Sequence, residues 1–329
     1  MKSMKVFVTH TLFGDYLKKL GEEYEVEVWP DRDIAKHDLL AKVKGVDGII
    51  SLLTEKIDAE VMEAAGDNLK VIANYAVGYD NVDIEEATKR GVVVTNTPGI
   101  LTEAVGEHAV AMMLALTRRI VEGDRFVRLG KYKGWEPDLL VGSGVRGKTM
   151  GIVGLGRIGR WTGRIACALG MKVVYNSHTR DDEFEEEHGA VYHTLDKLLE
   201  MADVVSLNVP LTEQTKNLVS ERELAIMKKS AVLINTARGG IVNETALIEA
   251  LKTGVIAGAG LDVFENENKP NEALYKLPNV ILTPHIASAT IEARMMMAKI
   301  AVESVTAVLK GRLPESIVNK EVWEKRRKI

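Results

Sequence analysis

The ten residues from 150 to 159, MGIVGLGRIG, constrain the fold more than any other stretch of this chain. A short apolar run, predicted as a strand, leads into three glycines with the spacing G-x-G-x-x-G. Apolar side chains then recur at helical spacing up to Leu169, and Gly170 stands where a helix C-cap is expected. Lys172–Tyr175 is predicted as a second strand. Strand, glycine turn, helix and strand in this order are the context in which the motif binds a dinucleotide.

Each glycine has a separate physical role in such a loop. The first permits a tight turn, the second lets the backbone approach a pyrophosphate, and the third allows the helix to pack closely on the strand. The helix N-terminus adds free N–H groups and a positive dipole end. A glycine-rich turn without a ligand is the alternative. The motif assigns cofactor contacts to Gly154, Leu155, Gly156, Arg157, Ile158 and Gly159.

Length and composition describe an ordinary globular protein. The 329 residues predict about two domains, with 46% hydrophobic and 27% charged residues. A formal net charge of −4 gives no electrostatic argument for binding nucleic acid or an anionic membrane. The single cysteine, Cys167, excludes an intrachain disulfide and is predicted to be a small buried side chain. We expect no metal site. Since no long apolar segment occurs, we also expect no membrane span and a cytoplasmic location.

Two series of strands and helices follow each other along the chain. The first ends near residue 98, and the breaker cluster Asn96–Gly99 is the predicted domain boundary. Alternating strands and helices predict a parallel sheet with helices on both faces. The loop Asn74–Asn81 follows a predicted strand, so we expect it to face a ligand. Strands of the first series are predicted at Lys5–Thr9, Glu25–Trp29, Gly48–Leu52, Lys70–Ala73 and Val92–Thr95.

The second series begins at Lys148. A long helix from Thr102 precedes it, and its apolar run Ala109–Leu116 fits either the core of the second domain or a subunit interface. Lys131–Lys148 is predicted as a surface loop, and about Thr290 to Lys310 as a long C-terminal helix. Strands after the glycine motif are predicted at Lys172–Tyr175, Asp203–Val209, Ala231–Asn235, Ile256–Asp262 and Val280–Thr283.

Polar residues follow three strands of the second series. Arg238, Glu267 and His285 each stand where a parallel sheet presents its ligands. Taken singly, each has a plain alternative. Arg238 fits a surface ion-pair residue, Glu267 a solvated loop acid, and His285 a satisfied polar residue at a strand end.

Taken together, these segments resemble the D-2-hydroxyacid dehydrogenase family, in its branch of glyoxylate/hydroxypyruvate reductases. The resemblance implies α/β architecture with two doubly wound parallel-sheet domains and an active-site cleft between them. A flavodoxin-like substrate-binding domain would comprise residues 1–98 and 290–329, and a Rossmann dinucleotide-binding domain residues 99–289. The resemblance covers nearly the whole chain, with motifs at Asn74–Asn81, Thr102–Ala109, the glycine loop, Asn235–Gly240, Gly258–Phe264 and Pro284–His285.

The family implies a role for each polar residue. Arg238 would bind the substrate carboxylate and carbonyl, for which a planar guanidinium is suited. His285 would protonate the carbonyl oxygen as hydride arrives, and Glu267 would hydrogen-bond that imidazole and favour its charged form. Val77 and Gly78 resemble the backbone donors that hold the carboxylate. The resemblance assigns further cofactor contacts to Val209, Pro210, Thr236, Ala237, Asp262 and Ala287, with Asp262 near the nicotinamide.

The end of the second strand of the motif bears on cofactor choice. Members that prefer NAD(H) place an Asp there to bind the ribose hydroxyls, whereas this chain has Asn176. An Asp would repel a 2′-phosphate, while the residues that follow can hydrogen-bond or pair with one. We therefore predict NADP(H), with NAD(H) as the alternative; a plain surface loop beside Asp181 and Asp182 is the competing interpretation. The contacts fall on Asn176, Ser177, His178, Thr179 and Arg180.

The expected reaction is reduction of a small 2-keto acid, glyoxylate or hydroxypyruvate, to the D-2-hydroxy acid. Alternatives are another substrate of the same family, such as 3-phosphoglycerate or phosphite, and a nucleotide-sensing module without catalysis. The family implies a homodimer through the Ala109–Leu116 region, with Trp135 either reaching a neighbouring site or packing within its own chain. Gly106, Asn268 and Ala287 depart from the usual Ala, Pro and Gly of the family.

Overall fold

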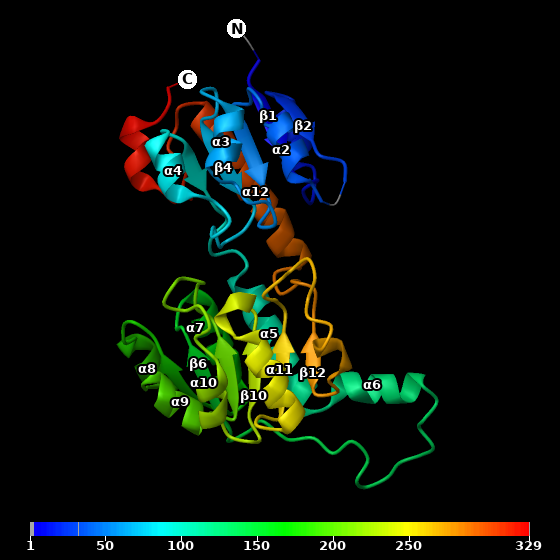
Figure 1. The fold of residues 1–329 in the computed structure, drawn as a ribbon. Coiled ribbons are helices and arrows are strands. Elements are labelled where there is room, and N and C mark those ends of the chain that lie inside the picture. The colour runs from blue at the N-terminus through cyan, green and yellow to red at the C-terminus, as the bar shows by residue number, and fades with distance from the viewer. Residues whose placement is uncertain (1–2, 32, 329) are drawn as a thin grey trace. The chain divides into compact units, whose positions relative to one another are not determined.

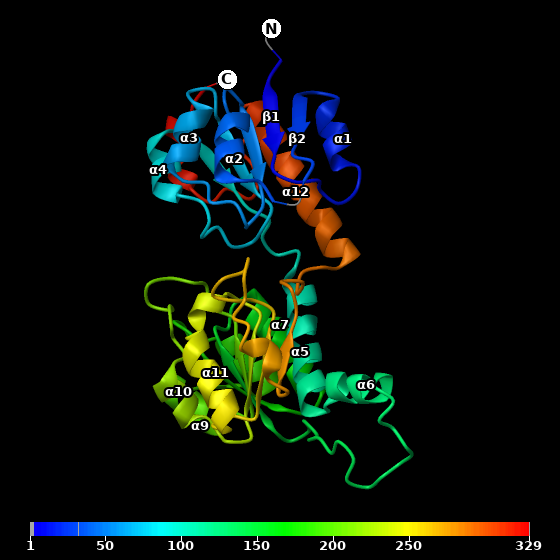
Figure 2. The ribbon, with the colours of Figure 1, turned by 45° about the vertical axis from the view of Figure 1, so that its right-hand side comes forward.

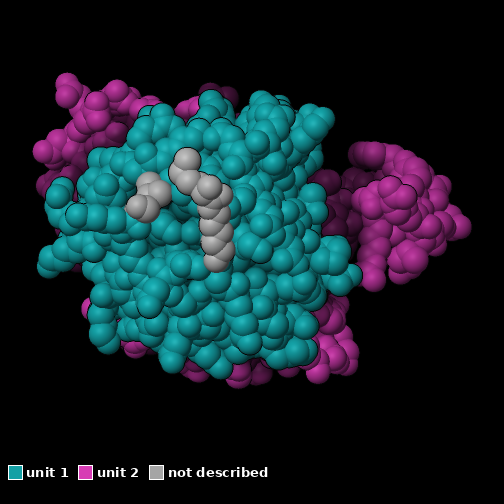
Figure 3. Space-filling view, turned by 90° about the horizontal axis from the view of Figure 1, so that it is seen from above, with its two compact units in different colours: residues 1–101, 289–329 teal, residues 102–288 magenta. Residues whose placement is uncertain are grey.

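The structure is a computed structural model that describes residues 3–31 and 33–328. Residues 1–2, 32 and 329, which the predicted substrate-binding ranges include, lie outside the described residues. The chain divides into two compact units (Figures 1 and 3). Unit 1 comprises residues 1–101 and 289–329, and unit 2 residues 102–288. Each contains one parallel sheet with helices on both faces, which confirms the predicted fold class.

The sheet of unit 1 has five parallel strands in the order β2-β1-β3-β4-β5, the doubly wound order of flavodoxin. Helices α1 (Tyr16–Gly21) and α12 (Ile291–Leu309) pack together on one face. Helices α2 (Lys36–Lys42), α3 (Ala59–Ala65) and α4 (Ile84–Lys89) cover the other face (Figure 2). The strands are β1 (Lys5–Val8), β2 (Glu25–Val28), β3 (Gly48–Ser51), β4 (Val71–Asn74) and β5 (Val93–Thr95).

The C-terminal segment is built into unit 1. Helix α12 lies against β3 and β4, and the hydroxyl of Tyr75 donates to the carbonyl oxygen of Arg294 at 2.8 Å. Farther along, the buried Asn319 accepts from the N–H of Val94 at 2.8 Å and donates to the carbonyl oxygen of Val92 at 3.0 Å. It leads into η3 (Lys320–Lys325), which lies beside α4. These bonds pair the edge strand β5 with the end of the chain.

The sheet of unit 2 has seven parallel strands in the order β12-β11-β10-β9-β6-β7-β8. Counted from β6, this is the Rossmann order 3-2-1-4-5-6 with one further strand. The direction of winding reverses between β6 and β9, which are neighbours in the sheet. The strands are β6 (Thr149–Val153), β7 (Lys172–Asn176), β8 (Val191–Tyr192), β9 (Val204–Leu207), β10 (Val232–Asn235), β11 (Gly258–Leu261) and β12 (Val280–Leu282).

Two apolar layers enclose this sheet. Along β10, Val232 and Ile234 pack toward one layer and Leu233 toward the other, as alternation in a strand requires. The first layer includes α5 (Thr102–Thr117), α7 (Arg157–Ala168) and α8 (Asp182–His188). The second includes α9 (Leu195–Met201), α10 (Glu221–Ile226) and α11 (Glu244–Thr253). Short 3₁₀ turns η1 (Gly239–Ile241) and η2 (Leu274–Lys276) follow β10 and β11.

The apolar run of α5 belongs to the core of unit 2. Ala109, Val110, Met112 and Met113 are buried against α7 and the sheet, so these four side chains belong to the domain core. Ala111 is exposed and Leu116 partly buried, and an interface through this region stays a prediction. Cys167 is only partly buried on α7, and burial raises the pKa of its thiol.

Helix α6 (Ile120–Arg128) and residues 129–147 leave the body of unit 2 (Figure 1). This helix buries none of its residues. The irregular segment after it confirms the predicted loop. Trp135 is 82% exposed, so packing within its own chain is excluded. Within the described part of the chain, every helix is too short or too polar to cross a membrane.

Candidate active site

The loop between β6 and α7 has the geometry that a bound phosphate requires. Gly154 has a φ of +95°, and a Cβ there would lie 2.7 Å from the carbonyl oxygen of Asn208. Gly159 also has no room for a side chain, because a Cβ built there would lie 2.2 Å from the carbonyl oxygen of Gly154. Gly156 is the N-cap of α7 without a side-chain cap, and nothing lies within 4 Å of a Cβ built on it. The N-terminus of α7 is thus uncapped by a side chain and open at Gly156, which fits a pyrophosphate.

The other residues predicted in this loop differ in which of their groups are accessible to a cofactor. The Leu155 side chain is 7% exposed and belongs to the core, so only its backbone is free to contact a ligand. Arg157 is exposed and Ile158 partly buried. The loop thus presents main-chain groups and one guanidinium.

Beyond β7, the predicted cofactor residues lie on a partly to fully exposed loop. The side-chain amide of Asn176 donates to the carbonyl oxygen of His193 at 2.9 Å. Arg180 is held by Glu185, with Nη2 2.6 Å from Oε2, and its guanidinium carbon lies 5.9 Å from the ring centre of Tyr192. Glu185 also accepts from the hydroxyl of Tyr175 at 2.7 Å. Arg180 is therefore an oriented side chain rather than a loose surface residue.

Two buried polar atoms lie at the ends of β9 and β10. The Asn208 Oδ1 and Thr236 Oγ1 atoms have no hydrogen-bond partner among the residues that the structure describes. Buried polar groups are normally paired, so unpaired ones at the strand ends of a Rossmann sheet fit a polar ligand. Val209 lies beside Gly154, since its Cγ1 is 2.8 Å from a Cβ built there. The sequence prediction included Thr236 but missed Asn208, because it placed Asn208 inside the predicted strand Asp203–Val209, whereas β9 ends at Leu207.

The three side chains predicted to be catalytic follow the neighbouring strands β10, β11 and β12. Asn235 lies opposite Leu261 in the register, and Leu261 opposite Leu282, so their loops leave one edge of the sheet. Asn235 fixes the first loop, because its amide donates to the carbonyl oxygen of Arg238 at 2.9 Å. A Cβ on Gly239 would lie 1.9 Å from the carbonyl carbon of Phe264, so only glycine lets these loops touch.

Glu267 and His285 form a pair. Nδ1 of His285 lies 3.2 Å from Oε1 of Glu267, with 24% and 33% of the two side chains exposed. The same Oε1 also accepts weakly from the N–H of Phe264 at 3.4 Å. Glu267 thus orients the imidazole from a loop that packs against Gly239, as the sequence predicted for these two residues. The pairing leaves Nε2 of His285 as the nitrogen that can serve a substrate.

A further carboxylate stands behind this pair. Burial raises the pKa of Glu244 at the start of α11, and the charges of Glu265 and Glu267 add to the shift. The Glu244 carboxylate accepts from the N–H of Glu265 at 3.3 Å, and the N–H of Glu244 donates to Glu265 at 2.9 Å. These reciprocal bonds anchor the start of the loop that carries Glu267.

His285 has a left-handed backbone, with a φ of +54°. Such strain in a residue other than glycine costs about 1–3 kcal/mol and persists only where neighbours fix it. Asp262 fixes it, because its fully buried carboxylate accepts from the N–H groups of Ile286 at 2.9 Å and Ala287 at 2.8 Å. Its carbonyl oxygen also accepts from the N–H of His285 at 2.9 Å. Asp262 and Ala287 were predicted as cofactor contacts; in this structure they are bonded to each other.

The predicted carboxylate donors lie in unit 1, after β4. The carbonyl oxygen of Val77 accepts from Asn96 at 2.7 Å, and that of Gly78 from Asn74 at 2.9 Å. Among the described residues, no acceptor is found for the N–H groups of Val77 and Gly78. A loop with its carbonyl groups tied down and its N–H groups unpaired fits a carboxylate ligand.

The structure shows the surroundings of the three residues that depart from the usual family pattern. Gly106 on α5 packs on α7, where a Cβ would lie 2.7 Å from Cδ1 of Trp161, so this glycine accommodates the large indole. Asn268 lies on an exposed turn, and its N–H donates to Asn266 Oδ1 at 3.2 Å. Ala287 is 5% exposed and its N–H is bonded to Asp262.

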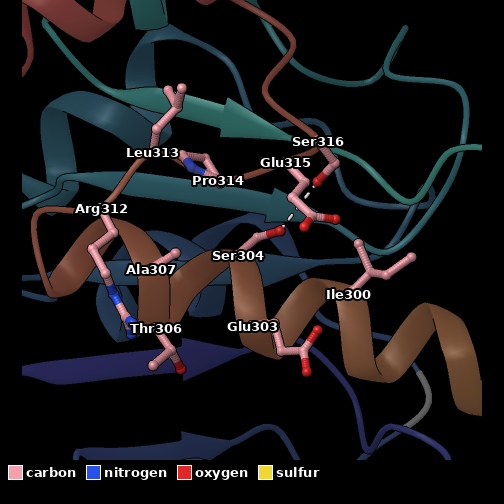
Figure 4. A pocket seen from close by; sticks show the side chains of 10 residues that line it. All are labelled: Ile300, Glu303, Ser304, Thr306, Ala307, Arg312, Leu313, Pro314, Glu315 and Ser316. Atoms are coloured by element: carbon pink, nitrogen blue, oxygen red, sulfur yellow. Dashed lines mark hydrogen bonds between the residues drawn. The ribbon is translucent and has the colours of Figure 1, made fainter.

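A pocket of about 340 Å³ lies in unit 1, between α12 and residues 312–316 (Figure 4). Ser304 and Ser316 are hydrogen-bonded at 3.1 Å, and the lining also includes Arg312, Glu303 and Glu315. Its lining includes none of the predicted site residues. The mixed charges favour no single ligand, and we assign it no role.

The strand order, the glycine loop and the acid–base pair define unit 2 as a Rossmann unit of the dehydrogenase type. Residues 110–287 match the model of the D-isomer specific 2-hydroxyacid dehydrogenase, NAD binding domain. The chain belongs to this family.

Its relatives cover both units. A glyoxylate reductase of Thermococcus litoralis is 51% identical over 323 residues, which is 97% of each chain. A glyoxylate reductase of Pyrococcus furiosus is 50% identical over 323 residues, 97% of this chain and 96% of its own. Among solved structures, an NADPH-dependent glyoxylate/hydroxypyruvate reductase of Sinorhizobium meliloti, in complex with NADP and malonate, superposes with a TM-score of 0.88. It is 36% identical and all of both chains is covered.

Proposed function

We propose that this protein reduces a small 2-keto acid, glyoxylate or hydroxypyruvate, to the D-2-hydroxy acid with NADPH as the preferred reductant. The observation that carries the proposal is the pairing of His285 with Glu267 at 3.2 Å, at the sheet edge where Arg238 also lies. The names of the full-length relatives support the same substrate class.

Separate residues of the chain bind the substrate and transfer the proton. When bound, NADPH supplies the hydride that reaches the carbonyl carbon of the substrate. Arg238 holds the substrate carboxylate with its planar, permanently charged fork, and the N–H groups of Val77 and Gly78 add two neutral donors. His285 keeps Nδ1 on Glu267 and gives the proton on Nε2 to the carbonyl oxygen, which becomes the hydroxyl. The carboxylate of Glu267 stabilises the imidazolium before the transfer and fixes the ring's direction.

The substrate is tested by following NADPH consumption with glyoxylate, hydroxypyruvate, pyruvate, phosphohydroxypyruvate and, with NADP, 3-phosphoglycerate and phosphite. We expect the highest kcat/KM with glyoxylate or hydroxypyruvate. A higher value with a phosphorylated acid or phosphite would replace the proposed substrate. NADPH binding without turnover of any of these compounds would favour a nucleotide-sensing module.

For the cofactor, we propose that the loop after β7 binds the 2′-phosphate of NADPH, with NADH as a poorer reductant. Asn176 brings no negative charge to the strand end, and Ser177, His178 and Thr179 add polar side chains there. Arg180, held by Glu185, brings a cation to the same loop. The ratio of kcat/KM for NADPH and NADH tests this, and a tenfold preference for NADH would refute it.

We also propose that the protein is a homodimer in which a second copy covers α6 and the segment after it. Seven apolar or aromatic side chains there are 50% to 82% exposed in the single chain: Ile120, Val121, Val127, Leu129, Tyr132, Trp135 and Val141. Surfaces of this kind mark interaction sites. Light scattering coupled to size exclusion should give twice the mass of one chain. A monomer at every concentration would refute the dimer.

A further inference from the structure

We propose that His108 is a positioning residue for the reaction. It holds the hydroxyl of Thr283, and through it the Asp262 carboxylate that keeps His285 in its left-handed turn. The inference rests on the proposed role of His285 as the proton donor. His108 itself is on α5, far in sequence from the other three residues, and it contacts neither Glu267 nor the His285 ring in any hydrogen bond described here.

The direction of each hydrogen bond follows from the donors present. The Thr283 hydroxyl lies 2.6 Å from Oδ1 of Asp262 and 3.1 Å from Nε2 of His108. An ionised carboxylate only accepts, so the one proton of the hydroxyl goes to Asp262. Nε2 of His108 must then carry a proton and donate to Thr283. The same nitrogen lies 3.5 Å from Oδ1 of Asp262.

The Asp262 carboxylate is the centre of this arrangement. Its side chain is fully buried, and such a group is stable only when its oxygens are well supplied with donors. Oδ1 receives the Thr283 hydroxyl and the N–H of Ile286, and Oδ2 receives the N–H of Ala287. Thr283 is thus the side-chain donor that places Oδ1, and His108 is the donor that places Thr283. His108 is 20% exposed by side chain, so it is partly sheltered from competing water.

The consequence falls on His285. Its left-handed backbone is held between Thr283, two residues before it, and Ile286 and Ala287, the two residues after it. All three of these residues are bonded to Asp262. If the carboxylate moves, the turn relaxes and the direction of the His285 ring changes. Substrate binding is proposed for Arg238, which is in another loop, so the loss should appear in kcat rather than in KM for the keto acid.

The test compares variants that keep or remove one donor. H108L removes the N–H at similar size, while H108Q places an amide N–H near the position of Nε2. T283V removes the hydroxyl and T283S keeps it. H37Q, which changes an exposed histidine of unit 1, is the control for handling a histidine variant. Chemical unfolding of each variant establishes that the fold is retained.

We expect H108L to lower kcat by at least about tenfold, since small misplacements of a reacting group have effects of this size or larger. KM for glyoxylate should stay within about threefold, which separates positioning from substrate binding. H108Q and T283S should recover most of the rate. T283V should lower kcat at least as much as H108L, because it removes the hydroxyl that donates to Asp262 itself. The double variant should be no worse than T283V alone, because His108 acts through that hydroxyl. Wild-type kcat in H108L, or additive losses in the double variant, would overturn the proposal.

A second readout does not depend on turnover. Amide hydrogen exchange at Ile286 and Ala287 should be faster in H108L and T283V than in the wild type, H108Q or H37Q. Unchanged exchange would overturn the proposal even if activity fell. If the wild type reduces no keto acid while exchange responds as expected, the proposed function fails and the structural role of His108 stands.

Discussion

Alanine should have different effects on stability and on NADPH binding at Gly156 and Gly159, two glycines of the β6–α7 segment. Gly159→Ala places a Cβ 2.2 Å from the carbonyl oxygen of Gly154 and 3.1 Å from Cγ2 of Ile152. Because the first contact is with backbone, helix and strand must move apart by about 1 Å to reach ordinary contact. Gly156→Ala meets nothing within 4 Å, and its φ of −80° is open to alanine.

The magnitudes follow from these contacts. Overpacking of a close backbone contact should cost Gly159→Ala about 2–3 kcal/mol in the free energy of unfolding. For a unit of this size, that lowers Tm by about 4–12 °C. Gly156→Ala should leave Tm unchanged or slightly raised. Its methyl group instead stands where a phosphate approaches the N–H groups of α7, and loss of one charge-assisted hydrogen bond, about 1.5–3 kcal/mol, weakens NADPH binding about 10- to 150-fold.

Thermal unfolding without nucleotide and calorimetric titration with NADPH measure the two effects separately. Gly159→Ala should lose stability and NADPH binding together, and Gly156→Ala should lose NADPH binding alone. A Gly156→Ala variant that binds NADPH with wild-type affinity would refute the placement of the phosphates. An unchanged Tm in Gly159→Ala would refute the packing argument.

Three other substitutions test separate parts of the account. Arg238→Lys keeps the charge but loses the bidentate fork, so kcat/KM for glyoxylate should fall at least about tenfold while NADPH affinity is kept; an unchanged kcat/KM would remove Arg238 from substrate binding. Glu244 keeps its proton to higher pH in the folded protein than in the unfolded chain, so charging it as pH rises costs stability. Glu244→Gln should therefore raise Tm at pH 7, and the gain should shrink toward about pH 4, where both states are protonated; a gain that grows on acidification would contradict this. Gly106→Ala should lower Tm despite better helix propensity, because the new Cβ would lie 2.7 Å from the Trp161 ring, and a higher Tm would show that the indole moves away at little cost.

Much of the fold could be predicted because its signals are local. Most strands of both series carry apolar runs, as buried parallel strands do, whereas the edge strand β2 alternates Glu and Val. The glycine spacing determines which strand begins the Rossmann order. Short elements without such runs were missed. Helix α8 is mostly acidic and β8 has only two residues, so neither gives a periodic pattern long enough to recognise.

Site residues on adjacent strands could be predicted for the same reason. Glu267 and His285 meet because parallel strands bring their loops to one edge. The arrangement around Asp262 could not be foreseen. His108 lies 175 residues before Thr283, and only the packing of α5 against β12 brings them together. Similarly, the ion pair between Arg180 and Glu185 depends on helix α8, which was not predicted from the sequence.

The central claim is that His285 delivers the proton in the reduction of a 2-keto acid. The most direct test is kcat for the reduction of glyoxylate by NADPH in His285→Ala beside the wild type, with the Kd for NADPH measured in both. General acid catalysis accounts for about 10²–10⁴-fold in rate, so kcat should fall at least a hundredfold while Kd stays the same. A variant that turns over near the wild-type rate would contradict the account.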